Sequence, residues 1–294
     1  MFVPWKHGRC IVCLRQAKLT REHLIPESLG GRLVTKFLCK PCNSTLGSRT
    51  ESIARSDPSI RLAIGNLSNR LPALARKLSE DQPYIAESTA GQVKGYVKNG
   101  QFYVRSTRLE DGSLVQPTPE AQRTVENILR KAGHEAPLRL NALQLFENAS
   151  ENERVEIAPG LEVIKWAIDR IQPDLSTPLM DPLVPIKIAF EFLALHLGGA
   201  VYDEAPQTAW VRKVLSDGDV NADFLQVEQL RGPQYAPFHG ICFEGNGPRA
   251  KVQIRLFGWL AFRVHFLHLA VGGPRFVYTH DLELQKEYVQ QLNE

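Results

Sequence analysis

Short apolar stretches separated by turn residues dominate the first part of the chain. Residues 20–25 and 33–38 each have the length and composition of a short strand, and a Pro and a Gly-Gly pair lie between them. Asn43 is well suited to be the N-cap of a helix that runs to about Ser56, since Asn is among the best capping residues. The pattern predicts strand, turn, strand and helix in this order.

The rest of the chain alternates between helical periodicity and strand-like alternation. Asn99-Gly100 is a strong hairpin signal between two alternating segments, and Gly258 marks a second hairpin turn. Pro72 must form a kink or a boundary in any helix that contains it. The predicted hairpins cover 92–98 with 101–105 and 251–256 with 260–266. The predicted helices lie at about 58–80, 119–132, 160–171, 186–197, 210–215 and 281–292.

This order of elements predicts an α+β protein in three parts. Residues 1–56 form a compact N-terminal module, and residues 57–82 form a helical connector. Residues 83–294 form a larger mixed α/β accessory region whose ligand the sequence does not indicate. At 294 residues the chain is long enough to bury a substantial core.

The composition is that of an ordinary soluble globular protein, with 43% hydrophobic and 23% charged residues. No apolar run approaches the length of a membrane span, and the N-terminus lacks the pattern of a secretory signal. The nearly apolar segment 186–197 is predicted to be a buried central helix. We therefore expect a cytoplasmic protein without a membrane partner.

Positive charge is concentrated at the N-terminus. Residues 1–56 contain ten Lys and Arg against three Asp and Glu, which gives +7, whereas the remaining residues carry 25 − 29 = −4. A basic module on a mildly acidic body is typical of a protein that binds a phosphate backbone. The charge pattern therefore favours nucleic acid as the partner.

Four of the five cysteines lie in two Cys-x-x-Cys pairs near the N-terminus. Cys10 and Cys13 form the first pair, and Cys39 and Cys42 form the second. Each pair can turn its two sulfur atoms to one side of a tight turn, so this spacing predicts a tetrahedral zinc site. Four protein ligands leave no open position for water, and the zinc is therefore expected to be structural.

The residues between and after the cysteine pairs are more specific. Glu22-His23 lies between the pairs, a Pro-x-x-x-Gly-Gly segment follows, and Asn43 comes directly after the last cysteine. This arrangement resembles the HNH endonucleases, the ββα-metal nuclease family. The flanking cysteines and the final Asn are similar to those of phage endonuclease VII. The resemblance covers roughly residues 8–56.

The resemblance implies roles for three side chains in phosphodiester hydrolysis. His23 would be the general base, because a neutral imidazole can take a proton from water near pH 7. Glu22 and Asn43 would hold one divalent cation, most plausibly Mg²⁺, which prefers oxygen ligands and keeps several waters. That cation would stabilise the departing 3′ oxygen, and the family pattern implies 5′-phosphate and 3′-hydroxyl products.

The chain also departs from the family pattern. Glu22 replaces the more common Asp, no Asn stands near Val34 to support the His-bearing loop, and Leu46 replaces a frequent Lys after the last ligand. Arg49 is expected to take over the phosphate contact of that Lys. The basic residues expected to contact nucleic acid are Arg21, Arg32, Lys36 and Arg49.

We therefore expect a zinc-stabilised, Mg²⁺-dependent endonuclease that acts on DNA. Two alternatives stay open at this point: a zinc-knuckle nucleic-acid-binding protein that has lost catalysis, and a nuclease directed at RNA. Any homo-oligomer contact or protein partner is expected to involve residues 83–294. Sequence preference and the number of strands cut are not indicated by the sequence.

Overall fold

The structure is a computed structural model, and two compact units make up the chain. The first unit contains residues 1–82 and 174–294, and the second contains residues 83–173. The described residues are 1–81, 84–88, 91–98, 101–109, 112–150, 153–159, 161–164, 180–202, 206–218, 223–232, 234–244, 249–267, 269–271 and 275–292.

The N-terminal module has the predicted order of strand, strand and helix. Strand β1 (Leu19–His23) pairs antiparallel with β2 (Val34–Cys39), and helix α1 (Lys40–Ser56) follows β2 directly. A 3-10 turn, η1 (Glu27–Leu29), lies between the strands. A register shift between Thr20 and Glu22 interrupts the pairing. The strand–strand–helix part of the α+β prediction is confirmed.

The segment predicted as one helix over 58–80 is two helices in the structure. Helix α2 (Pro58–Asn66) begins after Asp57, whose carboxylate accepts hydrogen bonds from the backbone N–H groups of Ser59 and Ile60 at 2.8 and 3.1 Å. Helix α3 (Pro72–Asp81) begins at the proline that the sequence marks as a kink or boundary. Pro72 is the first residue of the new helix, where its missing N–H costs nothing.

A six-stranded antiparallel sheet dominates the C-terminal part of the first unit. Its strand order is β10-β13-β12-β11-β14-β15, and the predicted hairpin at Gly258 is confirmed as the β12–β13 pair. Buried and exposed side chains alternate along β11 and β12, so one face of the sheet packs against the core. The strands are β10 (Leu225–Arg231), β11 (Phe238–Glu244), β12 (Ala250–Leu256), β13 (Leu260–Phe266), β14 (Arg275–Asp281) and β15 (Lys286–Leu292).

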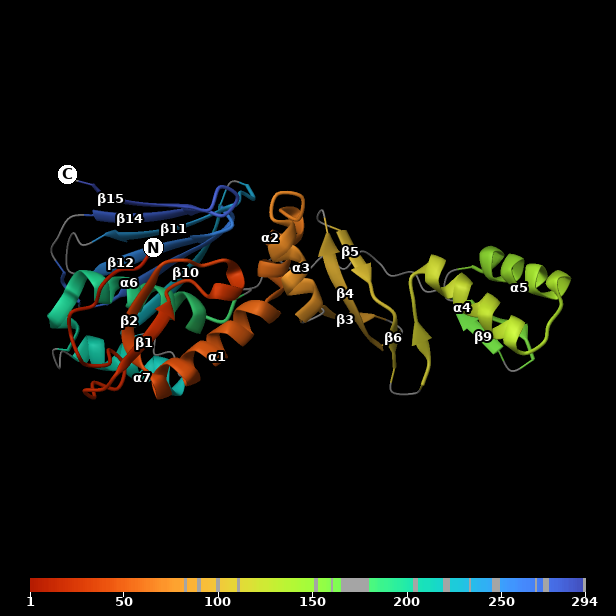
Figure 1. Ribbon diagram of the computed structural model, residues 1–294, viewed down its shortest axis with the longest axis horizontal. Coiled ribbons are helices and arrows are strands. Elements are labelled where there is room, and N and C mark those ends of the chain that lie inside the picture. The colour runs from red at the N-terminus through yellow and green to blue at the C-terminus, as the bar shows by residue number, and fades with distance from the viewer. Residues whose placement is uncertain are drawn as a thin grey trace. The chain divides into compact units, whose positions relative to one another are not determined.

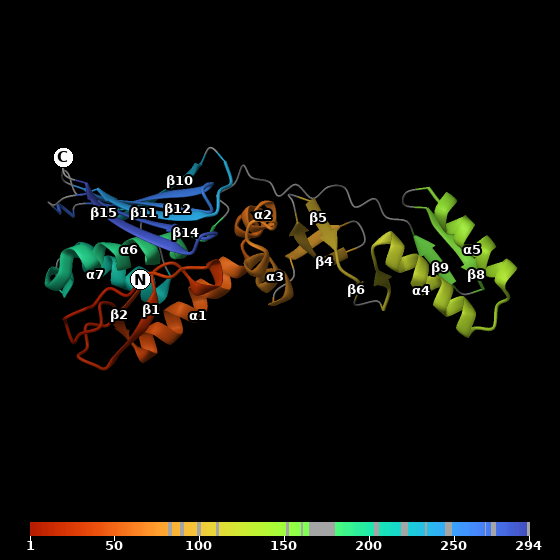
Figure 2. The same ribbon diagram turned by 45° about the horizontal axis from the view of Figure 1, so that its top comes forward.

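Helix α6 (Leu183–Leu197) is the central element of this unit. It lies between the six-stranded sheet and the β1–β2–α1 module, and all residues from Leu183 to Ala194 are buried (Figures 1 and 2). Segment Leu183–Tyr202 is long and apolar enough to cross a membrane, yet most of it is buried inside the unit. The prediction of a buried central helix at 186–197 is confirmed. The 3-10 turn η2 (Gly198–Tyr202) and helix α7 (Pro206–Asp217) follow.

The second unit contains the strands and helices of residues 83–173. A separate small core of buried side chains, including Val125 and Leu129, joins its helices to its last strand pair. Its three-stranded sheet contains β3 (Tyr84–Ser88), β4 (Gly91–Lys98) and β5 (Gln101–Val104). Its other elements are β6 (Thr107–Arg108), β7 (Leu114–Val115), α4 (Thr118–Lys131), α5 (Ala136–Asn148), β8 (Arg154–Ala158) and β9 (Leu161–Ile164).

Several sequence predictions differ from the structure. Residues 174–294 pack with residues 1–82, whereas the sequence predicted a single region over 83–294. The reason is α6, which buries its whole apolar surface only by lying between the sheet and the N-terminal module.

Two predicted helices are also wrong. The predicted helix at 281–292 is a turn followed by β15, because residues 286–292 pair with the neighbouring strand β14. The predicted helix at 160–171 begins instead as strand β9, paired with β8, and residues 165–171 lie outside the described part of the chain. Asn99 and Gly100, the expected turn between β4 and β5, also lie outside it.

Candidate functional site

The four motif cysteines come together at one end of the N-terminal module. Cys10 and Cys13 lie in a tight turn closed by a hydrogen bond from the Leu14 backbone N–H to the Cys10 carbonyl at 3.0 Å. Leu14 adopts φ = 59°, which lets the chain reverse immediately after the second cysteine. Cys39 ends β2 and Cys42 lies in the first turn of α1, so the strand-to-helix junction supplies the other two sulfur atoms.

The arrangement of the sulfur atoms fits a zinc ion. All four Sγ atoms lie within 4.8 Å of one another, and those of Cys13 and Cys39 are 3.7 Å apart. A tetrahedral zinc ion with Zn–S bonds of about 2.3 Å requires sulfur atoms about 3.8 Å apart. These four residues could therefore hold zinc as a structural ion that joins the N-terminal turn to the start of α1.

Local charge makes one of these thiols unusually acidic. Burial raises the pKa of the Cys13 thiol, but hydrogen bonds from Arg15 outweigh burial and lower the pKa to about 6. Burial raises the pKa of both Cys10 and Cys42 above the ordinary value. Cys13 thus becomes a thiolate, the form that binds metal, at a lower pH than Cys10 and Cys42.

His23 ends β1 and lines an open cleft of about 310 Å³. Its side chain is 28% exposed, and its Nδ1 lies 3.9 Å from a carboxylate oxygen of Glu27. Arg21 and Arg32 line the same cleft. The complete lining is Met1, Phe2, Arg21, His23, Glu27, Gly31, Arg32 and Val34. His23, Arg21 and Arg32 therefore line one space that is open to solvent.

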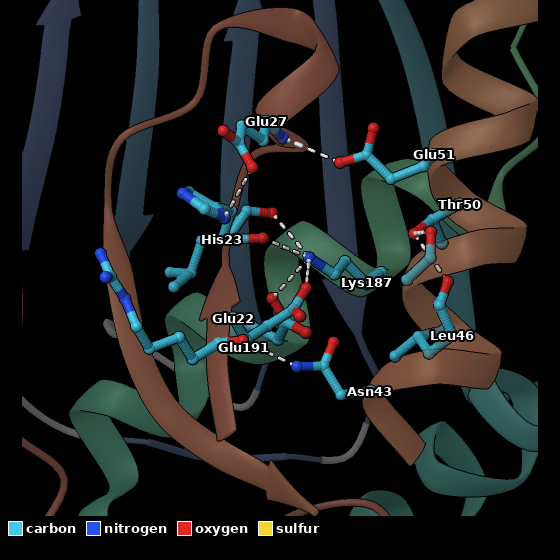
Figure 3. A network of polar contacts seen from close by, with 12 residues as sticks. Glu22, His23, Glu27, Asn43, Leu46, Thr50, Glu51, Lys187 and Glu191 are labelled. Carbon is cyan, nitrogen blue, oxygen red and sulfur yellow. Dashed lines mark hydrogen bonds and ion pairs between the residues drawn. The ribbon is translucent and has the colours of Figure 1, made fainter. Parts of the chain in front are cut away.

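Glu22 points to the other side of the strand, because successive side chains of a strand alternate between its two faces. Its side chain is 8% exposed, and its Oε1 lies 2.5 Å from Nζ of Lys187, a residue of α6. Figure 3 shows the Glu22 carboxylate directed toward Lys187 and the His23 ring directed toward Glu27. The structure does not bring Glu22 and His23 together around one point.

Asn43 is the fourth residue of α1 and is not its N-cap, which is Cys39. Its Nδ2 donates hydrogen bonds to Thr20 Oγ1 at 2.9 Å and to the Arg21 carbonyl at 2.7 Å. The helix begins four residues earlier than predicted because Pro41 sits in its first turn, where proline is favoured. Asn43 therefore fastens the first turn of α1 to β1.

The two side chains expected to hold Mg²⁺ do not fit that ion as the structure places them. The Glu22 carboxylate already contacts an ammonium group, and Asn43 turns its amide nitrogen, which cannot bind a cation, toward β1. A carbonyl oxygen accepts only, so the bond to Arg21 fixes this orientation of the amide. In this arrangement Glu22 could offer a cation only its second carboxylate oxygen, beside the Lys187 ammonium, and Asn43 could offer only its amide oxygen.

The predicted nucleic-acid contacts separate into two groups. Arg21 and Arg32 line the cleft beside His23, and Arg32 also donates hydrogen bonds to the carbonyl and side-chain oxygens of Gln285 at 3.2 and 3.1 Å. Lys36 is exposed on β2, and the Arg49 guanidinium lies against Gly218 after α7. Lys36 and Arg49 are not among the residues that line the cleft.

Two residues that hold the backbone of the His23 segment were not among the predicted site residues. Glu51 of α1 accepts hydrogen bonds from the backbone N–H groups of Glu27 and Ser28 at 2.8 and 3.3 Å, and so holds the 3-10 turn that follows His23. Lys187 donates to the carbonyl oxygens of His23 and Leu24 at 2.5 and 3.2 Å (Figure 3). The sequence signal for Lys187 is its position, with Glu191 four residues later, in a mostly apolar helix.

The charge state of the Lys187 cluster follows from its burial. Burial alone lowers the pKa of the Lys187 ammonium, but the carboxylates of Glu191 and Glu22 outweigh burial and raise it. Burial and the charge of Glu22 raise the pKa of Glu191 well above the ordinary value. Lys187 is therefore charged, and the Glu191 carboxyl tends to keep its proton.

Comparison with known proteins agrees with this geometry. Residues 10–58 match a protein-family model described as HNH endonuclease. The matched segment begins at the first zinc-type cysteine and contains β1, β2 and α1. No curated protein and no solved structure matches the chain. Residues 10–58 therefore resemble an HNH endonuclease module, and they include a cysteine cluster that fits zinc, as the sequence motifs indicate.

Proposed function

We propose that the N-terminal module is an endonuclease that hydrolyses DNA phosphodiester bonds, with His23 as the general base. The observation that carries the proposal is the position of His23 in an open cleft, next to Arg21 and Arg32, within the segment that matches the HNH endonuclease family. DNA is proposed as the substrate because the motif arrangement resembles nucleases that act on DNA.

The chain supplies two of the groups that the reaction needs. His23 would take a proton from water while the water oxygen attacks phosphorus and the bond from phosphorus to the leaving oxygen breaks. Such general base catalysis contributes roughly 10²–10⁴-fold to the rate. The guanidinium groups of Arg21 and Arg32 would hold the phosphate, since planar Arg side chains match phosphate geometry.

Glu27 would orient the base. Its carboxylate oxygen lies 3.9 Å from His23 Nδ1, and a small rotation would bring it to hydrogen-bond distance. A bond from Nδ1–H to Glu27 leaves Nε2 free to accept the proton of water. The divalent cation expected from the sequence stays a prediction. The proposed roles of His23, Glu27 and the two arginines do not depend on it.

Nicking of supercoiled plasmid tests the proposal. The zinc-loaded full chain is compared with His23→Ala and with His134→Ala, a half-exposed histidine of the second unit. We expect a loss of roughly 10²–10⁴-fold for His23→Ala and no loss for His134→Ala. Equal rates for the chain and His23→Ala would refute the assignment of His23. A matched single-stranded RNA run beside the plasmid decides between DNA and RNA.

One observation favours a second candidate, a nucleic-acid-binding protein without catalysis. The carboxylate expected to hold the catalytic cation is buried against Lys187. This candidate predicts that the chain and His23→Ala bind DNA equally and that neither nicks plasmid. Nicking therefore separates the two functions, and a gel-shift measurement on the same samples shows whether a protein that does not nick still binds DNA.

A further inference from the structure

A buried ammonium group occupies an oxygen-lined position directly behind His23. Lys187 Nζ has four oxygens within 3.2 Å: the carbonyls of His23 and Leu24, Oε1 of Glu22 and Oε2 of Glu191. The Lys187 side chain is 1% exposed. Figure 3 shows its ammonium among these oxygens. These oxygens come from β1, from the residue after it and from α6, so the position joins two parts of the chain that are more than 160 residues apart.

The surroundings of this ammonium are those of a cation-binding position. An ammonium group has three N–H donors, and two of them bond to backbone carbonyls that have a fixed direction. Glu22 supplies the compensating negative charge at 2.5 Å, and Glu191 lies at 2.9 Å one helical turn from Lys187 on α6. A buried charge is tolerated only with such partners.

The position of Lys187 conflicts with a second cation on Glu22. A divalent ion bound to the other Glu22 oxygen would lie close to the ammonium, and two positive charges repel strongly where water is excluded. The cation beside the Glu22 carboxylate is therefore the Lys187 ammonium, a group of the protein itself.

We propose that Lys187 is the resident cation of the HNH module: it takes the place at Glu22 that the sequence assigns to Mg²⁺ and fixes the main chain that carries His23. Lys187 is thus a positioning residue, acting through the backbone of His23. Glu22 is the ligand of Lys187 and does not bind a divalent metal. The positioning role rests on the proposed function, whereas the identity of the cation at Glu22 does not.

Mn²⁺ binding to the zinc-loaded full chain tests the proposal directly. Free Mn²⁺ is measured by electron paramagnetic resonance for the chain, Glu22→Gln, Lys187→Ala and the double variant Lys187→Ala/Glu22→Gln. We expect the chain and Glu22→Gln to bind the same amount of Mn²⁺. Lys187→Ala opens a pocket with two carboxyl groups and is expected to bind about one further equivalent, which the double variant loses.

A second measurement uses no substitution of a buried residue. Mn²⁺ is titrated into the chain labelled at histidine, and the ring resonance of His23 is identified by its absence in His23→Ala. We expect Mn²⁺ to leave the His23 resonance as sharp as that of His134. Selective broadening of His23 at one equivalent, or loss of Mn²⁺ binding in Glu22→Gln, would overturn the proposal.

These results are independent of cleavage. If plasmid nicking fails while Glu22→Gln leaves Mn²⁺ binding unchanged, the proposed function is wrong and the resident cation stands. If nicking depends on His23 while Mn²⁺ binds at Glu22, the proposed function stands and the resident cation is wrong. The pH profile of cleavage separates positioning from simple stability, because a misplaced His23 in Lys187→Ala shifts the profile and a loss of folded protein lowers it uniformly.

Discussion

The two ends of the β1–β2 pair hold charge in different ways. At one end, four cysteines within 33 residues gather their sulfur atoms into a zinc-type cluster. At the other end, Lys187 of α6 lies against Glu22 and the carbonyls of His23 and Leu24. The first position is made by neighbours in the sequence and the second by residues far apart. Local spacing reveals the first, and only the folded chain reveals the second.

The two positions also have different expected roles: the cysteine cluster stabilises the module, and the Lys187 contacts place His23, the proposed base. The cysteine cluster joins the N-terminal turn to α1, whereas Lys187 joins His23 to the central helix of the unit. Loss of zinc should therefore unfold the module, and loss of Lys187 should mainly weaken its attachment to α6. The following predictions test this division, beginning with the largest effect.

Removal of zinc or of one zinc ligand is expected to have the largest effect. Structural zinc contributes about 10–16 kcal/mol of apparent binding free energy in small zinc modules, so the module should unfold without it. Cys39→Ser should lose bound zinc and the circular dichroism of the module. Cys242→Ser lies outside the cluster and serves as the matched control. Native dichroism and native melting in a zinc-free chain would contradict a structural role for zinc.

Replacement of Lys187 by an apolar residue of similar length comes next. Lys187→Met leaves Glu22 buried without its partner, and breaking a buried pair in this way costs about 3–5 kcal/mol. Urea unfolding measures the change, with Lys36→Met, on the exposed face of β2, expected to cost less than about 0.5 kcal/mol. Lys187→Met/Glu22→Gln should recover part of the loss. Additive losses in the double variant would mean that the two side chains do not interact.

Acid is expected to weaken the contact between the sheet and the module through His239. Its Nε2 lies 2.9 Å from the Leu29 carbonyl, and its Nδ1 accepts a bond from the Phe257 N–H at 3.3 Å. Burial lowers the pKa of His239 to about 3, well below the unfolded value of about 6.5. The stabilising contribution is therefore complete above pH 6.5 and is lost as pH falls toward 3.

The size of this effect can be measured between pH 7 and pH 5. The contribution of His239 should fall by about 2 kcal/mol over this interval, at about 1.4 kcal/mol per pH unit below 6.5. Urea unfolding of His239→Gln should show a correspondingly weaker dependence on pH, and His134→Gln should behave like the unchanged chain. A pH dependence that is the same in His239→Gln would rule out His239 as its source.

The smallest expected effect concerns Glu51. Its carboxylate accepts the backbone N–H groups of Glu27 and Ser28, so Glu51→Ala should cost about 1–2 kcal/mol of unfolding free energy. Glu51→Gln keeps one acceptor oxygen and should cost less. If the two variants lose the same stability, the hydrogen bonds to the 3-10 turn are not the reason for the loss.

The sequence predicts those parts of the fold that depend on neighbouring residues. The β1–β2–α1 order and the buried helix α6 follow from local periodicity and composition, and the cysteine cluster follows from spacing. Strand β15 was missed because its residues suit a helix equally well, and only the free edge of β14 decides in favour of a strand. Asn43 was expected to be a cap because its neighbours alone do not reveal its bonds to β1.

The candidate site also contains residues that the sequence predicts and one that it does not. His23, Arg21 and Arg32 lie in one cleft as the motif suggests, because all three come from the two paired strands or the segment between them. The role of Lys187 could not be assigned, since the two backbone carbonyls that it binds lie 163 and 164 positions earlier in the chain. A charged residue in a mostly apolar helix predicts a buried partner, but the sequence does not indicate which distant residue that partner is.

The rate of plasmid nicking by the zinc-loaded chain and by His23→Ala, measured on samples with equal DNA binding, tests the central claim most directly. The account predicts that His23→Ala binds as tightly and nicks roughly 10²–10⁴-fold more slowly. Equal nicking rates, or no nicking by either protein at full DNA occupancy, would contradict it.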